Sequence, residues 1–455
     1  MPNSKNRWSS PSALLLALIG AASMLYYHQG LFMPRVVAVR TAEGLGQGYS
    51  FGNDFYQVWL TSRELLRGRR DLYSPEMTRE IQVGLYGRPL DIARPGDPID
   101  RRVFPYPAFA DLLFWPAAEL PFEIIRAAIV CVLAALTIAS VMLWLRVLDW
   151  PLTWNWIAVV LLLTLCSYPA LEALFASQLG LLVSFLLAAS ILALQRNRFL
   201  LSGILMAITT IKPQVTLLAI VYLLLWTLNN WQARNRFATG FFSTLTLLVG
   251  ASLAVMPHWI EAWARTVLAY RHYTRPPLVT EVLTSPLGPH WSSVATLLLT
   301  AASIVIAIIL AWRYRAAAAN SFAFVLTLSL LLSITTITIL PGQAVYDHLI
   351  LLPGILLLAR QSGLCRANAP VPSLLLLVGG LVLFWPWLAA FALILLRPFI
   401  PPAIFDSTPV FSLPIRTAAS LPFAVLALLA WTLRTASRQV TPAPNPESAS
   451  ATSYS

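Results

Sequence analysis

The chain has 455 residues, of which 58% are hydrophobic and 11% charged, and its mean hydropathy is +0.71. This composition lies outside the range of soluble globular domains and indicates a polytopic membrane protein. The formal charge of +12 does not indicate a nucleic-acid partner, because the basic residues stand in ones and twos between apolar runs and form no stripe. We expect membrane lipids as partners, and no nucleic acid.

The first apolar run, from Ser12 to about Met33, follows a short basic tail and is long enough to cross a bilayer. The small residues at 21 to 23 leave open a cleaved signal peptide as an alternative. The runs together predict an all-α polytopic membrane protein with about eleven to twelve transmembrane segments. After the first, we expect single spans at about 123–145, 152–168, 178–195, 237–256, 292–312, 320–340, 348–360, 371–396 and 416–433.

Arginines mark the breaks that we assign to one side of the membrane. By the positive-inside rule these breaks, and both termini, are cytoplasmic. The protein is then a multi-pass protein of the cell (inner) membrane, and its long first loop faces the outside or periplasm. The arginines that mark the inner side are Arg146, Arg196, Arg198, Arg234, Arg236, Arg313, Arg315, Arg360, Arg366, Arg434 and Arg438.

One integral membrane domain, residues 1–433, accounts for nearly the whole chain. Its outer loop, residues 34–121, is expected to carry interfacial helices, one of them in the proline-rich stretch 105–121. The part from 34 to 105 holds nine of the nineteen carboxylates. Residues 434–455 are rich in Pro, Ser, Thr and Ala and read as a disordered cytoplasmic tail.

Asp54 is the first candidate for chemistry that needs a carboxylate in water. It stands near the start of the outer loop among aromatic residues, before a segment, 55–66, whose apolar spacing predicts an interfacial helix. In an alternative interpretation, Asn53 or Asp54 is simply the N-cap of that helix, because Asn and Asp are favoured there.

Lys212 is one of only two lysines and lies between two apolar halves, each too short to cross a bilayer, ahead of Pro213. A charge deep in a bilayer is costly and usually faces a cavity or an anionic partner. We therefore expect its ammonium to hold a phosphate. The alternative is a lysine whose side chain reaches out to the interface.

Asp347 and His348 head a short apolar run and should lie near the same outer cavity as Lys212. Arg101 and Arg102 of the outer loop are further candidates for a phosphate. No H-E-x-x-H, Cys-x-x-Cys or glycine-rich phosphate loop occurs in the chain, so we expect neither a metal nor a cofactor.

In its ordered motifs the chain resembles the polyprenol-phosphate-mannose-dependent transferases of glycosyltransferase family 87, in the GT-C superfamily. The matching pieces are N-D-F-Y at 53–56, L-Y-S-P at 72–75, Tyr106-Pro107, Ser177-Gln178, Lys212-Pro213-Gln214 and the Asp347-His348 helix start. The chain departs from the pattern at Ala108, where a second proline is usual. It departs again at Gly180, where an asparagine often follows the glutamine.

The resemblance implies a GT-C-like bundle and a hexosyltransferase that takes a sugar, mannose in this family, from a polyprenyl-phosphate donor at the outer face. It implies Asp54 as the catalytic base, and a lipid or glycan acceptor. The donor phosphate is then expected at Lys212, His348, Arg101 and Arg102. Acceptor or sugar contacts are expected from Asn53, Tyr56, Tyr106, Gln178, Gln214 and Asp347.

The lipid phosphate is the leaving group of such a donor, so the protein must supply a base and a compensating positive charge. In-line attack opposite the phosphate inverts the anomeric centre. Two other classes stay open. A secondary transporter also uses broken helices with buried charges, and a lipid-linked polysaccharide ligase or polymerase shares the arginine-rich outer loops.

Overall fold

A computed structural model describes residues 11–45, 52–67, 71–150, 153–274, 279–341, 344–361, 370–405 and 408–440. Every regular element in these ranges is helical. Six helices are long and apolar enough to cross a membrane, or seven if a pair bent by 61° counts as one span. The predicted all-α polytopic membrane fold is confirmed. The six are Pro11–Ala42, Phe122–Val147, Trp231–Val255, His290–Arg313, Leu377–Leu396 and Leu413–Thr435.

The other apolar helices that we expected to span the membrane have 10–17 residues. A helix of that length extends only about 15–25 Å, less than the hydrocarbon core of about 30 Å. The predicted span 152–168 is the shorter α7 (Trp154–Leu165), which is followed after a sharp bend by α8 (Tyr168–Ala176). The predicted span 348–360 is divided between η5 (Val345–Leu351) and α17 (Leu352–Gln361). The expected number of segments therefore exceeds the number of helices that satisfy the length criterion.

The short helices lie inside the bundle. Within α16 (Phe322–Thr338) every residue from Phe324 onward is buried, and most of α9 (Gly180–Gln195) is buried as well. Glycines bring α10 (Phe199–Ile208) close to the longer α12 (Trp231–Val255): a Cβ at Gly203 would stand 2.1 Å from the Phe237 carbonyl oxygen. Close backbone approach through small residues is the usual way in which membrane helices pack.

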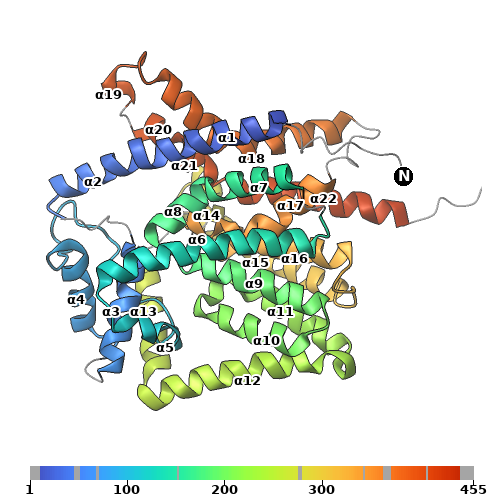
Figure 1. The fold of residues 1–455 in the computed structure, drawn as a ribbon, viewed down its shortest axis with the longest axis horizontal. Coiled ribbons are helices and arrows are strands. Elements are labelled where there is room, and N and C mark those ends of the chain that lie inside the picture. Colours follow the sequence, from blue (N-terminus) through green and yellow to red (C-terminus); the bar gives the residue numbers. More distant parts are fainter. Residues whose placement is uncertain are drawn as a thin grey trace, which may run out of the picture.

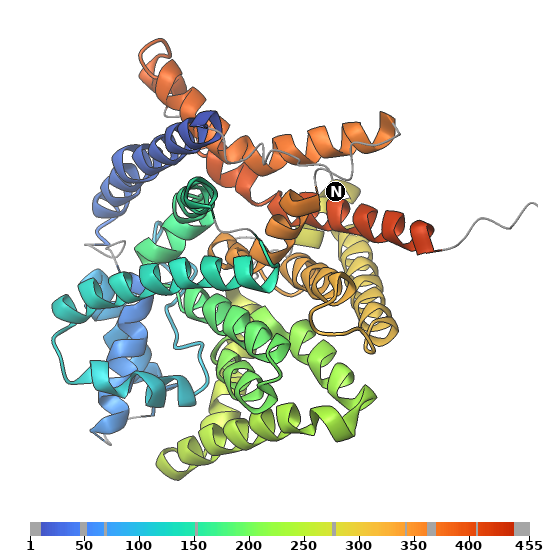
Figure 2. The same ribbon diagram turned by 45° about the vertical axis from the view of Figure 1, so that its right-hand side comes forward.

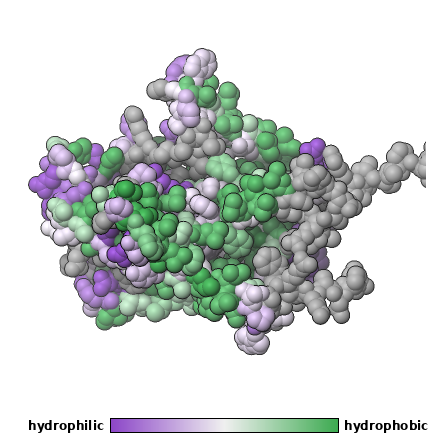
Figure 3. All heavy atoms as spheres, turned by 90° about the horizontal axis from the view of Figure 1, so that it is seen from above, coloured by the Kyte–Doolittle hydropathy of each residue, from purple (hydrophilic) through white to green (hydrophobic). Residues whose placement is uncertain are grey.

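The loop helices gather at one end of the bundle. α2 (Met33–Ala42), α3 (Asn53–Leu66), α4 (Pro75–Tyr86), α5 (Phe109–Ala118) and α13 (Trp259–Thr274) lie at the left of Figure 1, and the start of α1 (Pro11–Tyr26) lies toward the right. In Figure 2, turned by 45° about the vertical axis, the blue and light-blue helices α2 to α4 are again at the left. Hydrophilic surface is concentrated at that end in Figure 3, whereas green apolar side chains cover the middle. The long-loop end and the N-terminal end of α1 are therefore opposite.

Hydrogen bonds join the breaks that carry the arginines. Gln195 donates to the carbonyls of Val147 and Ala319, and the Arg234 guanidinium donates to the carbonyl of Trp226 and, at 3.5 Å, to that of Arg315. These breaks therefore share one end of the bundle, as predicted from the arginine pattern. Which side of the membrane this end faces stays a prediction.

The ends of the chain differ from expectation in two ways. The first helical stretch continues to Ala42, so the loop begins later than residue 34. α22 (Leu421–Val440) continues past 434, where we expected the tail to begin, and residues 441–455 lie outside the described ranges. At the first boundary the π-helical turn Tyr27–Phe32 places Pro34 in the first turn of α2, where proline is tolerated. At the second, the sequence contains no glycine or proline between Arg434 and Pro442.

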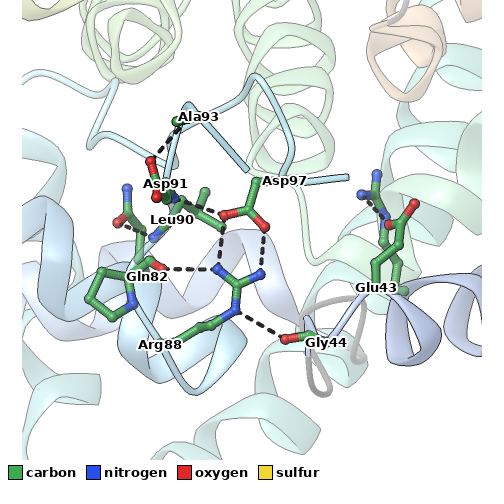
Figure 4. Close-up of polar contacts among 10 residues, drawn as sticks. Glu43, Gly44, Gln82, Arg88, Leu90, Asp91, Ala93 and Asp97 are labelled. Atoms are coloured by element: carbon green, nitrogen blue, oxygen red, sulfur yellow. Dashed lines mark hydrogen bonds and ion pairs between the residues drawn. The ribbon is translucent and has the colours of Figure 1, made fainter. Parts of the chain in front are cut away.

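Arg88 ties the outer loop together (Figure 4). Its two terminal nitrogens donate to the two carboxylate oxygens of Asp97 at 2.8 and 2.5 Å, and its Nε donates to the carbonyl of Gly44. The hydrogen bonds from Arg88 lower the pKa of Asp97 to about 2. This two-pronged ion pair fixes the 88–97 segment against the end of α2.

Candidate active site

The N-terminus of α3 places Asp54 without using it as a cap. Gly52 is the N-cap residue, in the left-handed region at φ 83°, and no side chain caps the helix. The Gly52 amide donates to the Phe175 carbonyl at the end of α8, which joins the two helices. The interpretation of Asn53 or Asp54 as a cap is therefore wrong, because glycine takes that position and the Asp54 carboxylate is bonded elsewhere.

Both oxygens of the Asp54 carboxylate accept hydrogen bonds from distant parts of the chain. Arg102 Nη1 donates to Oδ1 at 2.7 Å, and Gln178 Nε2 donates to Oδ2. Burial raises the pKa of Asp54 above its ordinary value, and the positive charge of Arg102 lowers it in part. Each carboxylate oxygen has a second lone pair, so Asp54 can still accept a proton from a third group.

One partner of Asp54 stands at an unusual backbone position, and the other directly follows one. Arg102 itself has φ 57°, and its amide donates to the Asp100 carboxylate at 2.9 Å. Gln178 directly follows Ser177, which has φ 56°. Non-glycine residues rarely adopt this region, and where they do they cluster at functional sites.

The extended segment that carries Arg102 is held on three sides. Gln82 of α4 donates to the carbonyl of Arg101, Tyr73 donates to the carbonyl of Tyr106, and Trp263 of α13 donates to the carbonyl of Pro105. The Arg102 Nε donates to the Tyr86 hydroxyl at 2.9 Å. The position of the guanidinium therefore depends on contacts from several parts of the outer loop and from α13.

Lys212 lies at the break between η3 (Thr209–Ile211) and α11 (Pro213–Asn229), as predicted from Pro213. Its residue is only 6% exposed. The ammonium donates to Asp347 Oδ1 at 2.6 Å and to Gln178 Oε1 at 3.2 Å, and lies 4.9 Å from the centre of the Tyr346 ring. These contacts hold the side chain inside the protein, which argues against a lysine that reaches out to the interface.

Gly180 makes the Lys212–Asp347 pair possible. A Cβ at this position would stand 2.2 Å from Asp347 Oδ1 and 3.6 Å from Lys212 Nζ. The departure from the family pattern at Gly180 therefore falls where the Asp347 carboxylate packs against the start of α9. Any side chain there would displace the carboxylate.

A cavity of about 670 Å³ joins these groups. It brings together eight of the residues that we selected from the sequence, from the outer loop, the start of α9, the Lys212 break and η5. Those eight are Asn53, Asp54, Arg102, Tyr106, Gln178, Lys212, Gln214 and Asp347.

Three selected residues do not line this cavity. Arg101 lies over the Tyr273 ring at 4.6 Å, and His348 is buried with no hydrogen-bond partner for its Nδ1 among the described residues. Tyr56 lines a second cavity on the far side of α3, because positions 54 and 56 are about 200° apart around a helix. Their direct contact with a donor or acceptor in the main cavity has no support from the geometry.

The cavity also contains charged residues that sequence reasoning missed. Glu172 of α8 faces it and accepts a hydrogen bond at 3.1 Å from Nε2 of buried His28, in the π-helical turn η2 (Tyr27–Phe32), because the Gln29 amide donates to the other ring nitrogen. Arg40 of α2 lines it, as does the exposed Arg416 of α21 (Leu413–Ala418), which has no hydrogen bond from its guanidinium among the described residues. A lone charge beside an apolar run, away from the arginine-bearing breaks, is the signal that could have identified Glu172 and Arg416.

The fold and the cavity define a polytopic membrane protein with a charged, mostly buried site at the end where its loop helices gather. The chain belongs to glycosyltransferase family 87: the model of that family matches residues 104–341, more than half of the chain. No curated protein and no solved structure matches the chain significantly.

The matched range contains part of the site only. Tyr106, Gln178, Lys212 and Gln214 lie within it, whereas Asp54 precedes it. The hydrogen bond from Gln178 therefore connects Asp54 to the family-matched part of the chain. The family indicates a glycosyltransferase and gives no support to a transporter.

Proposed function

We propose that this glycosyltransferase transfers a sugar, mannose in the first instance, from a polyprenyl-phosphate donor to an acceptor hydroxyl at the outer face of the membrane, with inversion. The observation that carries the proposal is the Asp54 carboxylate in a cavity lined by Arg102 and Lys212. A base and cations in one enclosed space are what displacement of a phosphate by a hydroxyl requires.

Asp54 is the proposed base. The acceptor oxygen attacks the anomeric carbon of the donor and loses its proton to Asp54. The bond between that carbon and the phosphate oxygen breaks, and the phosphate leaves with the electron pair. Attack on the face opposite the phosphate inverts the anomeric centre. Burial raises the pKa of Asp54, which improves its match to a hydroxyl proton.

The phosphate is proposed to lie between Lys212, Arg102 and Arg416. Lys212 is paired with Asp347, so a phosphate shares or displaces that carboxylate. Arg102 uses Nη1 and Nε for Asp54 and Tyr86, and its Nη2 has no hydrogen bond among the described residues. Arg416 brings a further cation from a different element of the bundle. Guanidinium and ammonium groups meet phosphate charge without a metal.

The amides and phenol of the cavity are proposed to bind the sugar and the acceptor. The Gln178 side chain donates a hydrogen bond to Asp54 and accepts one from Lys212, so it lies between the proposed base and the proposed phosphate region. Asn53, Gln214 and Tyr106 line the same space. Buried amide and hydroxyl groups at a sugar site favour ligands that complete their hydrogen bonds.

The test is sugar transfer in membranes that contain the protein. Radiolabelled polyprenyl-phosphate-mannose, polyprenyl-phosphate-glucose and a nucleotide-linked mannose are supplied in parallel, with Asp54→Asn membranes as the control. We expect label in product from a polyprenyl-phosphate sugar only, and an anomeric configuration opposite to that of the donor. Transfer from the nucleotide sugar with none from either lipid donor would contradict the proposal.

A further inference from the structure

A second cavity, of about 490 Å³, lies on the side of α3 away from Asp54. Tyr56, Trp59 and Arg63 line it, three residues at helical spacing on one face, whereas Asn53, Asp54 and Gln57 of the other face line the main cavity. One helix thus separates two cavities at the loop end of the bundle. None of the main-cavity residues takes part in the second one.

Three aromatic rings form one wall of the second cavity. The ring of Phe122, at the start of α6 (Phe122–Val147), lies 4.9 Å from that of Tyr56 and 5.4 Å from that of Trp59. Trp59 is anchored because its Nε1 donates to the Leu120 carbonyl at 3.0 Å. Tyr56 lies over Gly84, where a Cβ would meet the phenol oxygen at 1.9 Å. A tyrosine packed on glycine, next to two other rings, gives a flat apolar surface at a polar cavity.

Two guanidiniums of the cavity have hydrogen-bonding capacity to spare. Arg63 lies over the Trp59 ring at 5.4 Å, and its buried Nε has no hydrogen-bond partner among the described residues. The Arg126 side chain lies against Gly52, and it makes no hydrogen bond or ion pair with the residues that the structure describes. A buried donor without a partner is costly, so a native protein usually satisfies it with water or a ligand.

The charges of the cavity balance. Two exposed carboxylates, Glu119 and Glu123, line it beside the two arginines. A site for phosphate would carry an excess of positive charge, whereas balanced donors and acceptors around an aromatic surface suit an uncharged polyhydroxylated ligand. Sugar rings offer C–H faces to the aromatic rings, and their hydroxyls both donate to carboxylates and accept from guanidiniums.

We propose that the second cavity is a saccharide-binding site, which holds a part of the glycan acceptor that does not react. The assignment as an acceptor subsite rests on the proposed function, whereas saccharide binding itself does not. Because α3 stands between the two cavities, a glycan bound here lies outside the catalytic space and extends the contact of the enzyme with its acceptor across the helix that carries Asp54.

The test is calorimetric titration of the full-length protein, purified in a sugar-free zwitterionic detergent so that no maltoside or glucoside competes. The probes are α-linked mannotetraose, maltotetraose and cellotetraose, with no donor present. The variants are Arg63→Gln and Tyr56→Phe, with Arg79→Gln as a matched control, since Arg79 is an exposed arginine of the same loop that lines neither cavity. Asp54→Asn is included to identify binding in the main cavity.

We expect at least one probe to bind the parent, Arg79→Gln and Asp54→Asn alike. We expect binding to weaken about tenfold or more in Arg63→Gln, the effect of losing one charge-assisted hydrogen bond. Absence of binding for all three probes would overturn the proposal, as would binding that survives in Arg63→Gln and Tyr56→Phe but is lost in Asp54→Asn. Because no donor is used, failure here is distinct from failure of the transfer assay.

Discussion

Asp54 and Lys212 are joined through one side chain: Gln178 donates its amide to Asp54 and accepts from the Lys212 ammonium through its carbonyl oxygen. The orientation of the amide therefore follows from its neighbours, since the reverse orientation would place N–H groups against the ammonium. The proposed base and the proposed phosphate ligand are thus coupled. A change in one is expected to be felt by the other.

Replacement of Asp54 tests the base. We expect Asp54→Asn to reduce transfer by about two orders of magnitude or more, because asparagine cannot take the acceptor proton. Activity is measured with labelled lipid donor at matched protein yield and thermal stability. Asp71→Asn and Asp91→Asn in the same loop are the controls and should stay active. Equal activity in all three variants would remove Asp54 from the mechanism.

The pH profile of transfer tests the environment of Asp54. The reactive form is ionised, and burial raises its pKa, so the acid limb of kcat/KM should lie above the ordinary aspartate value of about 3.9. Because the charge of Arg102 lowers that pKa, Arg102→Gln should move the acid limb to higher pH in whatever activity remains. An acid limb that stays in place in Arg102→Gln would show that another group titrates.

The Lys212–Asp347 pair makes separate predictions for stability and donor use. Lys212→Ala leaves a buried carboxylate unpaired, which costs about 3–5 kcal/mol, so a lower thermal midpoint is expected with a strong loss of donor affinity. Lys212→Arg should keep part of both, since a guanidinium also meets a carboxylate and a phosphate. Lys212→Ala combined with Asp347→Ala should recover stability but not donor affinity. Normal donor affinity in a folded Lys212→Ala protein would exclude a phosphate role.

Gly180→Ala tests the close approach of Asp347 to α9. A Cβ there would stand 2.2 Å from the carboxylate oxygen, so the carboxylate must move by about 1 Å, and misplacement on that scale can cost about 10²-fold in rate. Gly250→Ala is the matched control, because a Cβ at that helical glycine meets nothing within 4 Å. Transfer activity and thermal stability are compared. Equal activity of the two variants would mean that the position of Asp347 does not matter for transfer.

Cysteine accessibility tests the predicted sides of the membrane. In a background without the native cysteines, a cysteine at Gln232 should react only from the cytoplasmic side, and one at exposed Ile92 only from outside. α6 begins next to the loop helices at Phe122 and ends at the break that carries Arg146, so this break and the long loop lie at opposite ends of the bundle and the two positions must differ. Outside labelling at Gln232 together with inside labelling at Ile92 would place the cavity on the cytoplasmic side.

Much of the fold follows from the sequence by itself, because hydropathy is a local property. Apolar length identified the membrane helices, and Pro213 located the break at Lys212 because proline cannot continue the hydrogen bonds of the preceding helix. The breaks that carry arginine were placed at one end from charge alone. Asp54 and Lys212 could be selected as site candidates from the sequence, because charged residues are rare in such a chain.

Only the tertiary structure decided which of these groups meet. Gly52 takes the cap position locally, whereas the pairing of Asp54 with Arg102 depends on where the segment around residue 102 returns, and nothing near Asp54 encodes that. Glu172 and Arg416 enter the cavity because α8 and α21 pack beside it. Helical periodicity alone places Tyr56 on the other side of α3 from Asp54. Only the tertiary structure shows that a second cavity lies on that side. The physical reason is that burial and pairing of charges are set by contacts between distant segments, whereas composition and spacing describe only each segment.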